Sequence, residues 1–156
     1  MPLGAARLTF LARSVLTAAA EVIRKKASIQ AVGNAQVDTA QRQFGGGSAL
    51  FDGSGDYLTV LNVPAPGTGD FCYEGWFRMP NNNVDYALFG SDGFNGDMII
   101  RRVNDGTVRL GRDDTAWDLT SSVVSIANAW RHIAVTRSGS TAKIFVNGTE
   151  VASASN

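Results

Sequence analysis

The chain has 156 residues, with 14 basic and 14 acidic side chains, so its formal net charge is zero. This length suits one domain with a hydrophobic core, and the charge balance argues against a strongly basic nucleic-acid-binding protein. Its single cysteine, Cys72, excludes an internal disulfide. No apolar stretch approaches the roughly 20 residues of a membrane-spanning helix.

The amino-terminal part differs in charge from the rest of the chain. Residues 1–43 hold six basic and two acidic side chains, whereas the other 113 residues hold eight and twelve. Arginines spread through the apolar part do not match a secretory signal, whose positive charge precedes the apolar region. From Ser14 to Lys26 the apolar residues follow helical spacing. Residues 1–26 are therefore predicted to form an extended or partly helical arm outside the β core.

From residue 27 the pattern changes to the two-residue period of β-strands. Residues 27–38 predict one or two half-polar strands. Residues 49–51 predict a short buried strand, and another strand begins at Tyr57. Between these two strands, the glycines and aspartates of residues 52–56 predict a tight turn and a hairpin-like corner.

Residues 70–79 alternate cleanly between two faces. The alternation places Phe71, Tyr73, Gly75, Phe77 and Met79 on one face, and Cys72, Glu74, Trp76 and Arg78 on the other. Large side chains on both faces predict a central strand between two packed layers. Cys72 is accordingly expected to be a buried small hydrophobe, and Trp76 and Trp130 are expected in the core.

The remaining residues read as short strands separated by turns. Asn104-Asp105-Gly106 and Asn147-Gly148 are strong two-strand connectors, and residues 138–140 form a hairpin tip. Ten to twelve short strands at regular spacing predict an all-β protein, a jelly-roll β-sandwich.

Four motifs carry a resemblance to a known family. They are residues 44–53 with Tyr57-Leu58, Glu74-Gly75-Trp76-Phe77, residues 130–137, and residues 143–148. In this order they resemble the concanavalin A-like laminin-G sandwich, which implies such a domain over residues 27–156 after the arm of residues 1–26. Residues 33–41 resemble the version common in bacteriophage virion proteins.

Two departures from the family pattern shape the expected assembly. The family usually continues past the Asn147-Gly148 hairpin with further strands, so the sandwich is expected to be shortened at its carboxyl end, with an unpaired sheet edge. The family also does not require an amino-terminal arm. We expect the arm, of this subunit or a neighbour, to cover such an edge by strand addition.

The phage resemblance implies a virion structural protein, made in the host cytoplasm and placed on the capsid surface or tail. The sequence-based expectation is a capsid decoration (cement) protein that binds the major capsid protein or other virion proteins as a homo-oligomer, most simply a trimer, with neither nucleic acid nor membrane as partner. The arm residues expected to make contacts are Arg7, Leu8, Phe10, Leu11, Arg13, Val15, Leu16, Arg24, Lys25 and Lys26.

The alternative is a carbohydrate-binding module of a tail fibre or host-receptor-binding protein. Trp117, flanked by Asp113, Asp114 and Asp118, is the candidate aromatic platform for surface glycans.

Enzymatic activity is not expected. Glycoside hydrolases of this fold need two carboxylates, and none of the three glutamates, Glu21, Glu74 and Glu150, has an acidic neighbour two residues away. His132, the sole histidine, lacks an accompanying nucleophile motif and is expected to be structural.

No cofactor is expected, and calcium is the open alternative. One histidine and one cysteine do not make a zinc site. The turn residues that calcium would use are Asp92, Asn95, Asp97, Asp113, Asp114 and Asp118. Residues 52–56 also mimic the start of a calcium loop, but no glutamate closes the ligand set.

Overall fold

The computed structural model describes residues 5–7, 28–61, 63, 67, 69–80, 83–90, 98–112, 117–125 and 127–155, with only the backbone of 5–7, Arg112 and Trp117. Every regular element within these ranges is a strand. The strands are β1 Ala5–Arg7, β2 Ser28–Val32, β3 Gln36–Asp38, β4 Ser48–Leu50, β5 Tyr57–Leu61, β6 Phe71–Arg78, β7 Tyr86–Gly90, β8 Met98–Arg102, β9 Val108–Arg112, β10 Trp117–Thr120, β11 Trp130–Ser138, β12 Thr141–Val146 and β13 Thr149–Ser155.

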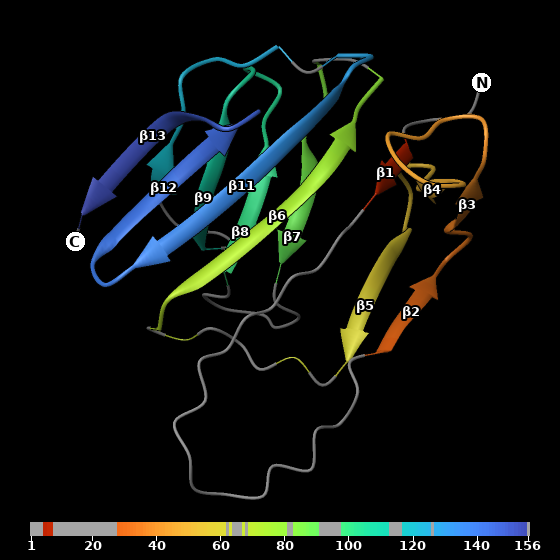
Figure 1. Cartoon of the computed structure of the whole chain (residues 1–156), viewed down its shortest axis with the longest axis horizontal. Helices are drawn as coiled ribbons and strands as arrows, with labels where there is room; N and C mark the ends of the chain where they lie inside the picture. The colour runs from red at the N-terminus through yellow and green to blue at the C-terminus, as the bar shows by residue number, and fades with distance from the viewer. Residues whose placement is uncertain are drawn as a thin grey trace, which may run out of the picture.

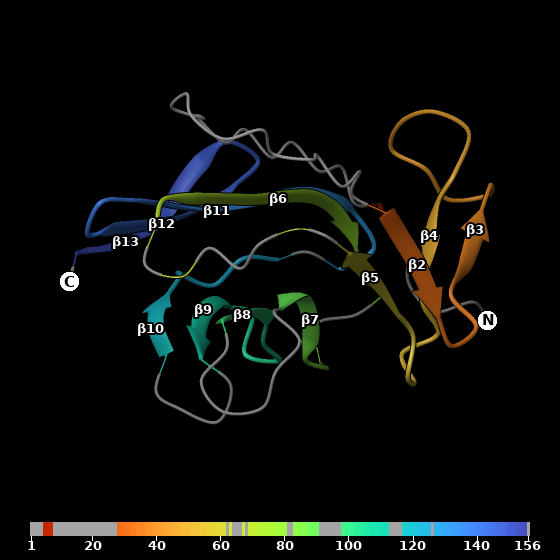
Figure 2. The same cartoon turned by 90° about the horizontal axis from the view of Figure 1, so that it is seen from below.

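These strands form two facing sheets and a small third one. The seven-stranded sheet has the order β13-β12-β11-β6-β1-β4-β3, and the four-stranded sheet has the order β10-β9-β8-β7 (Figure 1). Seen from below, the two sheets make separate layers (Figure 2). Strands β2 and β5 pair only with each other. The arrangement confirms the predicted all-β sandwich.

The hydrophobic core lies between the two larger sheets. Phe77 of β6 packs edge-on against Phe89 of β7, with ring centroids 5.4 Å apart. Ile100, Ile133 and Ile144, on β8, β11 and β12, have no exposed surface. Burial of each such side chain contributes about 1.5–3 kcal/mol, so the two layers depend on each other for stability.

Among the described residues, strand β6 has a packed layer on one face only, so the prediction of two packed layers is wrong for this part of the chain. It is central within its sheet, between β11 and β1, but the four-stranded sheet covers only the face that carries Phe77. Cys72 is exposed on the other face. Trp76 and Trp130 are half-buried and lie outside the core cluster. The error arose because aromatic side chains that pack on one another at a surface give the same sequence pattern as core residues.

The corner of residues 52–56 joins two sheets instead of closing a hairpin. Strand β4 pairs with β1 and β3, whereas β5 pairs with β2. The carboxylate of Asp56 holds the corner, because it accepts hydrogen bonds from the backbone N–H groups of Asn34 (2.8 Å) and Asp52 (2.9 Å). Asp56 therefore links the β2–β3 turn to the corner.

The hairpin predictions near the carboxyl end are confirmed. Asn147 and Gly148 both have positive φ, 50° and 80°, as a type I′ turn requires, and Val146 pairs with Thr149 across it. Between β8 and β9, Gly106 N donates to Val103 O at 2.9 Å, and the positive φ of Gly106 closes the loop.

Residues Ala5–Arg7 of the expected arm form β1, which lies inside the seven-stranded sheet. Ala6 pairs with Phe77 of β6 on one side and with Ala49 of β4 on the other. Strand addition by the amino terminus therefore occurs within this subunit and joins two groups of strands. The edges of this sheet are β13 and β3.

Substituting Gly33→Ala should lower the free energy of unfolding by about 1–3 kcal/mol. Gly33 has a φ of +76°, and a Cβ there would lie 2.9 Å from the Gly55 carbonyl oxygen. Gly46 has open space around it, so Gly46→Ala should change stability by no more than about 0.5 kcal/mol. Urea unfolding of both variants checks this. If Gly33→Ala and Gly46→Ala were equally stable, the close approach of Gly33 to the Gly55 carbonyl would not restrict which residue can occupy position 33.

Candidate functional site

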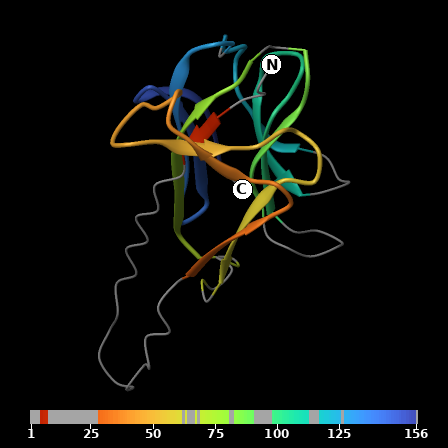
Figure 3. The ribbon, with the colours of Figure 1, turned by 90° about the vertical axis from the view of Figure 1, so that its right-hand side faces the viewer.

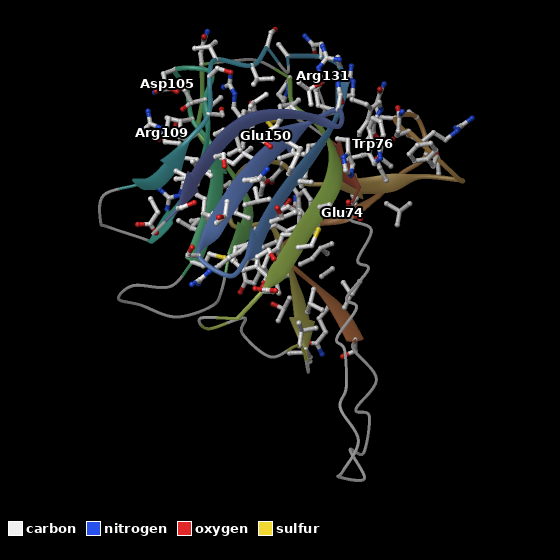
Figure 4. The ribbon with its side chains drawn as sticks, turned by 60° about the vertical axis from the view of Figure 1, so that its left-hand side comes forward. Glu74, Trp76, Asp105, Arg109, Arg131 and Glu150 are labelled. Carbon is white, nitrogen blue, oxygen red and sulfur yellow. The ribbon has the colours of Figure 1, made fainter. Side chains whose placement is uncertain are left out.

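The outer face of β6 and β11 carries the candidate site, hereafter the outer-face site, which consists of Glu74, Trp76, Arg78, Trp130 and His132. The antiparallel register sets His132 opposite Trp76, and Trp130 opposite Arg78. Directly paired residues share a face of a sheet, so the five side chains form one patch. Figure 4 shows Glu74 and Trp76 along β6.

An aromatic cluster forms the centre of this patch. The Trp76 ring lies 5.4 Å from the Phe44 ring in an edge-on arrangement and 5.4 Å from the His132 ring at an interplanar angle of 52°. Phe44 comes from the segment before β4 and is 49% exposed. Because ring contacts of this geometry are favourable, they hold Trp76 in place while part of its surface stays accessible.

His132 is fixed from two directions. Its Nε2 lies 3.4 Å from a carboxylate oxygen of Glu74. Its backbone N–H donates to Asn147 Oδ1 at 3.0 Å, and its carbonyl accepts from Asn147 N at 2.8 Å. The imidazole and the Glu74 carboxylate are both partly exposed, so water screens their attraction. The pair therefore contributes little to the stability of the fold, and its main effect is to hold two polar groups beside Trp76.

Arg78 and Cys72 extend the face at either end. Arg78 is half-buried, and its side chain makes no hydrogen bond or ion pair within the part of the chain that the structure describes. Cys72 is exposed as a residue, but neighbouring protein atoms partly desolvate its thiol and raise its pKa, and the nearby Glu74 carboxylate raises it further. The thiol is therefore less ionised than an ordinary cysteine at the same pH.

The two glutamates of the outer face are too far apart for glycoside hydrolysis. Successive pairings place Glu74, Ala134, Phe145 and Glu150 in one row across β6, β11, β12 and β13. Three strand spacings separate the ends of the row by about 14 Å, whereas glycosidase carboxylates lie about 5–9.5 Å apart. Glu150, labelled in Figure 4, instead pairs with Lys143 Nζ at 2.8 Å.

A second charged cluster, in the β8–β9 loop, has a structural explanation. Asp105 accepts hydrogen bonds from Thr107 N (2.9 Å) and Thr107 Oγ1 (2.7 Å) and pairs with Arg109. These contacts, the Thr107 hydroxyl first, lower the pKa of Asp105. The cluster holds the hairpin loop in shape.

The sugar-binding residues expected from sequence are only partly described. Trp117 begins β10, an edge strand of the four-stranded sheet, and Asp118 on the same strand is exposed. Asp113 and Asp114 lie outside the described residues. The grouping of these aspartates around Trp117 therefore stays a prediction.

The expected arm contacts also lie mostly outside the described residues. Only Arg7 falls within them, as the last residue of β1. The others are Leu8, Phe10, Leu11, Arg13, Val15, Leu16, Arg24, Lys25 and Lys26.

The calcium candidates Asp92, Asn95 and Asp97 are likewise outside the described part. Asp52 and Asp56 accept backbone N–H groups of the corner. Among the described residues, no three carboxylate, histidine or cysteine side chains gather around one point. The described ranges also contain no helix long and apolar enough to cross a membrane.

Sequence reasoning missed the outer-face site although its signal was visible. The alternation of Glu74, Trp76 and Arg78 on one face of β6 was recognised, but that face was assigned to the protein interior. An acid, an aromatic and a base in alternation are more typical of an accessible face, because Glu and Arg are rarely buried without a partner. That rule could have identified the site.

Comparison with known families agrees with this geometry. A family model described as the concanavalin A-like lectin/glucanases superfamily matches residues 52–156. The matched part contains strands β5 to β13, including both strands of the outer-face site. No curated protein and no solved structure matches the chain.

Alkylation of Cys72 should report on the electrostatics of this face. We expect iodoacetamide to react more slowly with the folded protein at pH 8 than with the urea-unfolded chain, because the thiolate reacts and the raised pKa reduces its fraction. Glu74→Gln should speed the reaction, since it removes a negative charge near the thiolate. The matched Glu150→Gln control lies at the far end of the row and should leave the rate unchanged. Equal rates for both variants would contradict the assigned cause.

Proposed function

The chain belongs to the concanavalin A-like lectin/glucanase superfamily, and we propose that it is a non-catalytic carbohydrate-binding domain that holds saccharides on the outer face of its seven-stranded sheet. The observation that carries this proposal is the position of Trp76. It lies outside the core, between Phe44 and His132, on a strand that pairs with neighbours along both sides.

The composition of the outer-face site suits a saccharide. Saccharide sites combine an apolar or aromatic surface with a few fixed polar groups. Trp76 supplies the surface, and Glu74, His132 and Arg78 supply acceptors and donors at neighbouring positions of the sheet. Because the groups stand on paired strands and not on loops, little side-chain or backbone ordering opposes binding.

The spacing of the two glutamates supports binding without hydrolysis. Glu74 and Glu150 are separated by three strand spacings. Glu74 lies 3.4 Å from His132, and Glu150 lies 2.8 Å from Lys143. Neither is placed to act with the other on one glycosidic bond.

A second candidate function is the virion structural role, with the domain decorating a capsid or forming part of a tail. The observation that favours it is the β2–β5 ribbon, which contains no charged residue and exposes Ile29 (55%), Tyr57 (53%) and Leu61 (38%). It lies at the opposite end of the molecule from β13 (Figures 1 and 2), and Figure 3 views the molecule from the ribbon's end. An isolated two-stranded ribbon is marginally stable. Its register places Tyr57 and Leu61 on one face and Ile29 on the other, so both faces expose apolar side chains, which indicates a contact surface. The partner would be the major capsid protein, another virion protein or further copies of this chain in a trimer.

Trp76→Ala should weaken saccharide binding at least about tenfold, or about 1.4 kcal/mol, because the ring surface is lost. A glycan array with the full chain identifies ligands, and calorimetric titration of the best one measures the change. Trp117→Ala, which removes the platform expected from sequence, is the matched control and should bind normally. Loss of binding in Trp117→Ala alone would move the site to β10, and an array without any ligand would overturn the proposal.

For the virion role, Ile29→Ser and Tyr57→Ser should convert an oligomer of the full chain into a monomer, as measured by light scattering. These variants are cleaner than deletion of residues 1–26, which would also remove β1 from the sheet. Val123→Ser is the matched control, because Val123 is 74% exposed but lies beside Gly106 of the β8–β9 loop. A full chain that is monomeric at high concentration, and that does not bind capsids, would exclude this second function.

A further inference from the structure

We propose that the outer-face site takes an acidic saccharide of the hexuronate class, with its ring on Trp76 and its carboxylate on Arg78. This inference rests on the proposed function, because it specifies the ligand of the same site. It starts from the one cation of the site that lacks a counter-charge.

Arg78 stands on the same face as Trp76, two residues further along β6 and thus about 7 Å away. Within the described part of the chain its side chain has no hydrogen-bond or ion-pair partner. Arg78 and the opposing Trp130 are both half-buried. Reduced contact with water weakens screening, so an anion that reaches this guanidinium gains more than it would at a fully exposed arginine.

The described residues around Arg78 do not supply that anion. Glu74 lies four residues from Arg78 along β6, about 13 Å away, and its carboxylate is next to His132 Nε2. On the other side of β6, Ala6 of β1 pairs with Phe77, so the same register brings Ala5, an uncharged residue, to the Arg78 row. The positive charge therefore stays available to a ligand.

The distance between Trp76 and Arg78 and the planar shape of the guanidinium both favour a sugar that carries a carboxylate. The planar guanidinium can donate two parallel hydrogen bonds to a planar carboxylate. In a hexuronate the carboxylate projects from the edge of the pyranose ring, so a ring placed on Trp76 directs it along the strand toward Arg78. A neutral saccharide would cover Trp76 but leave the Arg78 charge without a partner, which disfavours its binding.

Calorimetric titration with trigalacturonate and with its methyl ester, in low salt, tests the assignment. The full chain should bind trigalacturonate at least tenfold more tightly than the ester, and Arg78→Gln should abolish this difference. Arg78→Lys, which keeps the charge but not the planar fork, should restore part of it. The matched control Lys143→Gln removes one positive charge from the same sheet face and should leave the difference intact.

The outcomes separate this inference from the proposed function. Equal binding of both probes by the full chain, or an unchanged preference in Arg78→Gln, overturns the acidic ligand while the saccharide site on Trp76 stands. Binding of neither probe also overturns the acidic ligand, and the glycan array then decides the proposed function separately. An equal loss of preference in Lys143→Gln would reveal a general charge effect and would likewise overturn the role of Arg78. Thermal unfolding of each variant confirms that the comparison is made between folded proteins.

Discussion

The pairing of β6 with β11 is the constraint on which the rest of the structure depends. Eight consecutive residue pairs join the two strands. Because side chains alternate along a strand, this one register sends Phe77 and Ile133 into the core and Trp76 and His132 to the opposite face. A slip of the register by one residue would exchange the two faces of the strand. Packing of the core therefore also determines which side chains form the outer-face site.

This coupling explains how a protein of modest size presents a polar and aromatic site without weakening its interior. The face that carries Phe77 is anchored by the four-stranded sheet, and Asn147 of the β12–β13 hairpin holds the backbone of His132. The outer face is free to carry Glu74 and Arg78, whose burial in a core would be unfavourable. The proposed saccharide ligand is consistent with superfamily membership and with the side-chain geometry of this face.

Strands distant in sequence complete the scaffold around this pair. Strand β1 joins β6 to β4, and the Asp56 carboxylate ties the corner before β5 to the turn after β2. The uncharged β2–β5 ribbon is set apart from these layers. The proposed saccharide site on the large sheet and the proposed contact surface on the ribbon lie on different elements, so the two proposed functions do not compete for the same residues.

The sequence by itself determined most of the strands, the Asn147-Gly148 turn and the class of fold. Period-two alternation and the Asn147-Gly148 turn are local, and their physical causes act within a few residues. Only the tertiary structure decided that β4 and β5 enter different sheets, that β1 inserts beside β6, and that Trp76 faces outward. Alternation defines two faces of a strand, but long-range packing decides which face is covered. For that reason the sequence did not indicate the patch of Trp76, His132 and Arg78, which the pairing of β6 with β11 brings together.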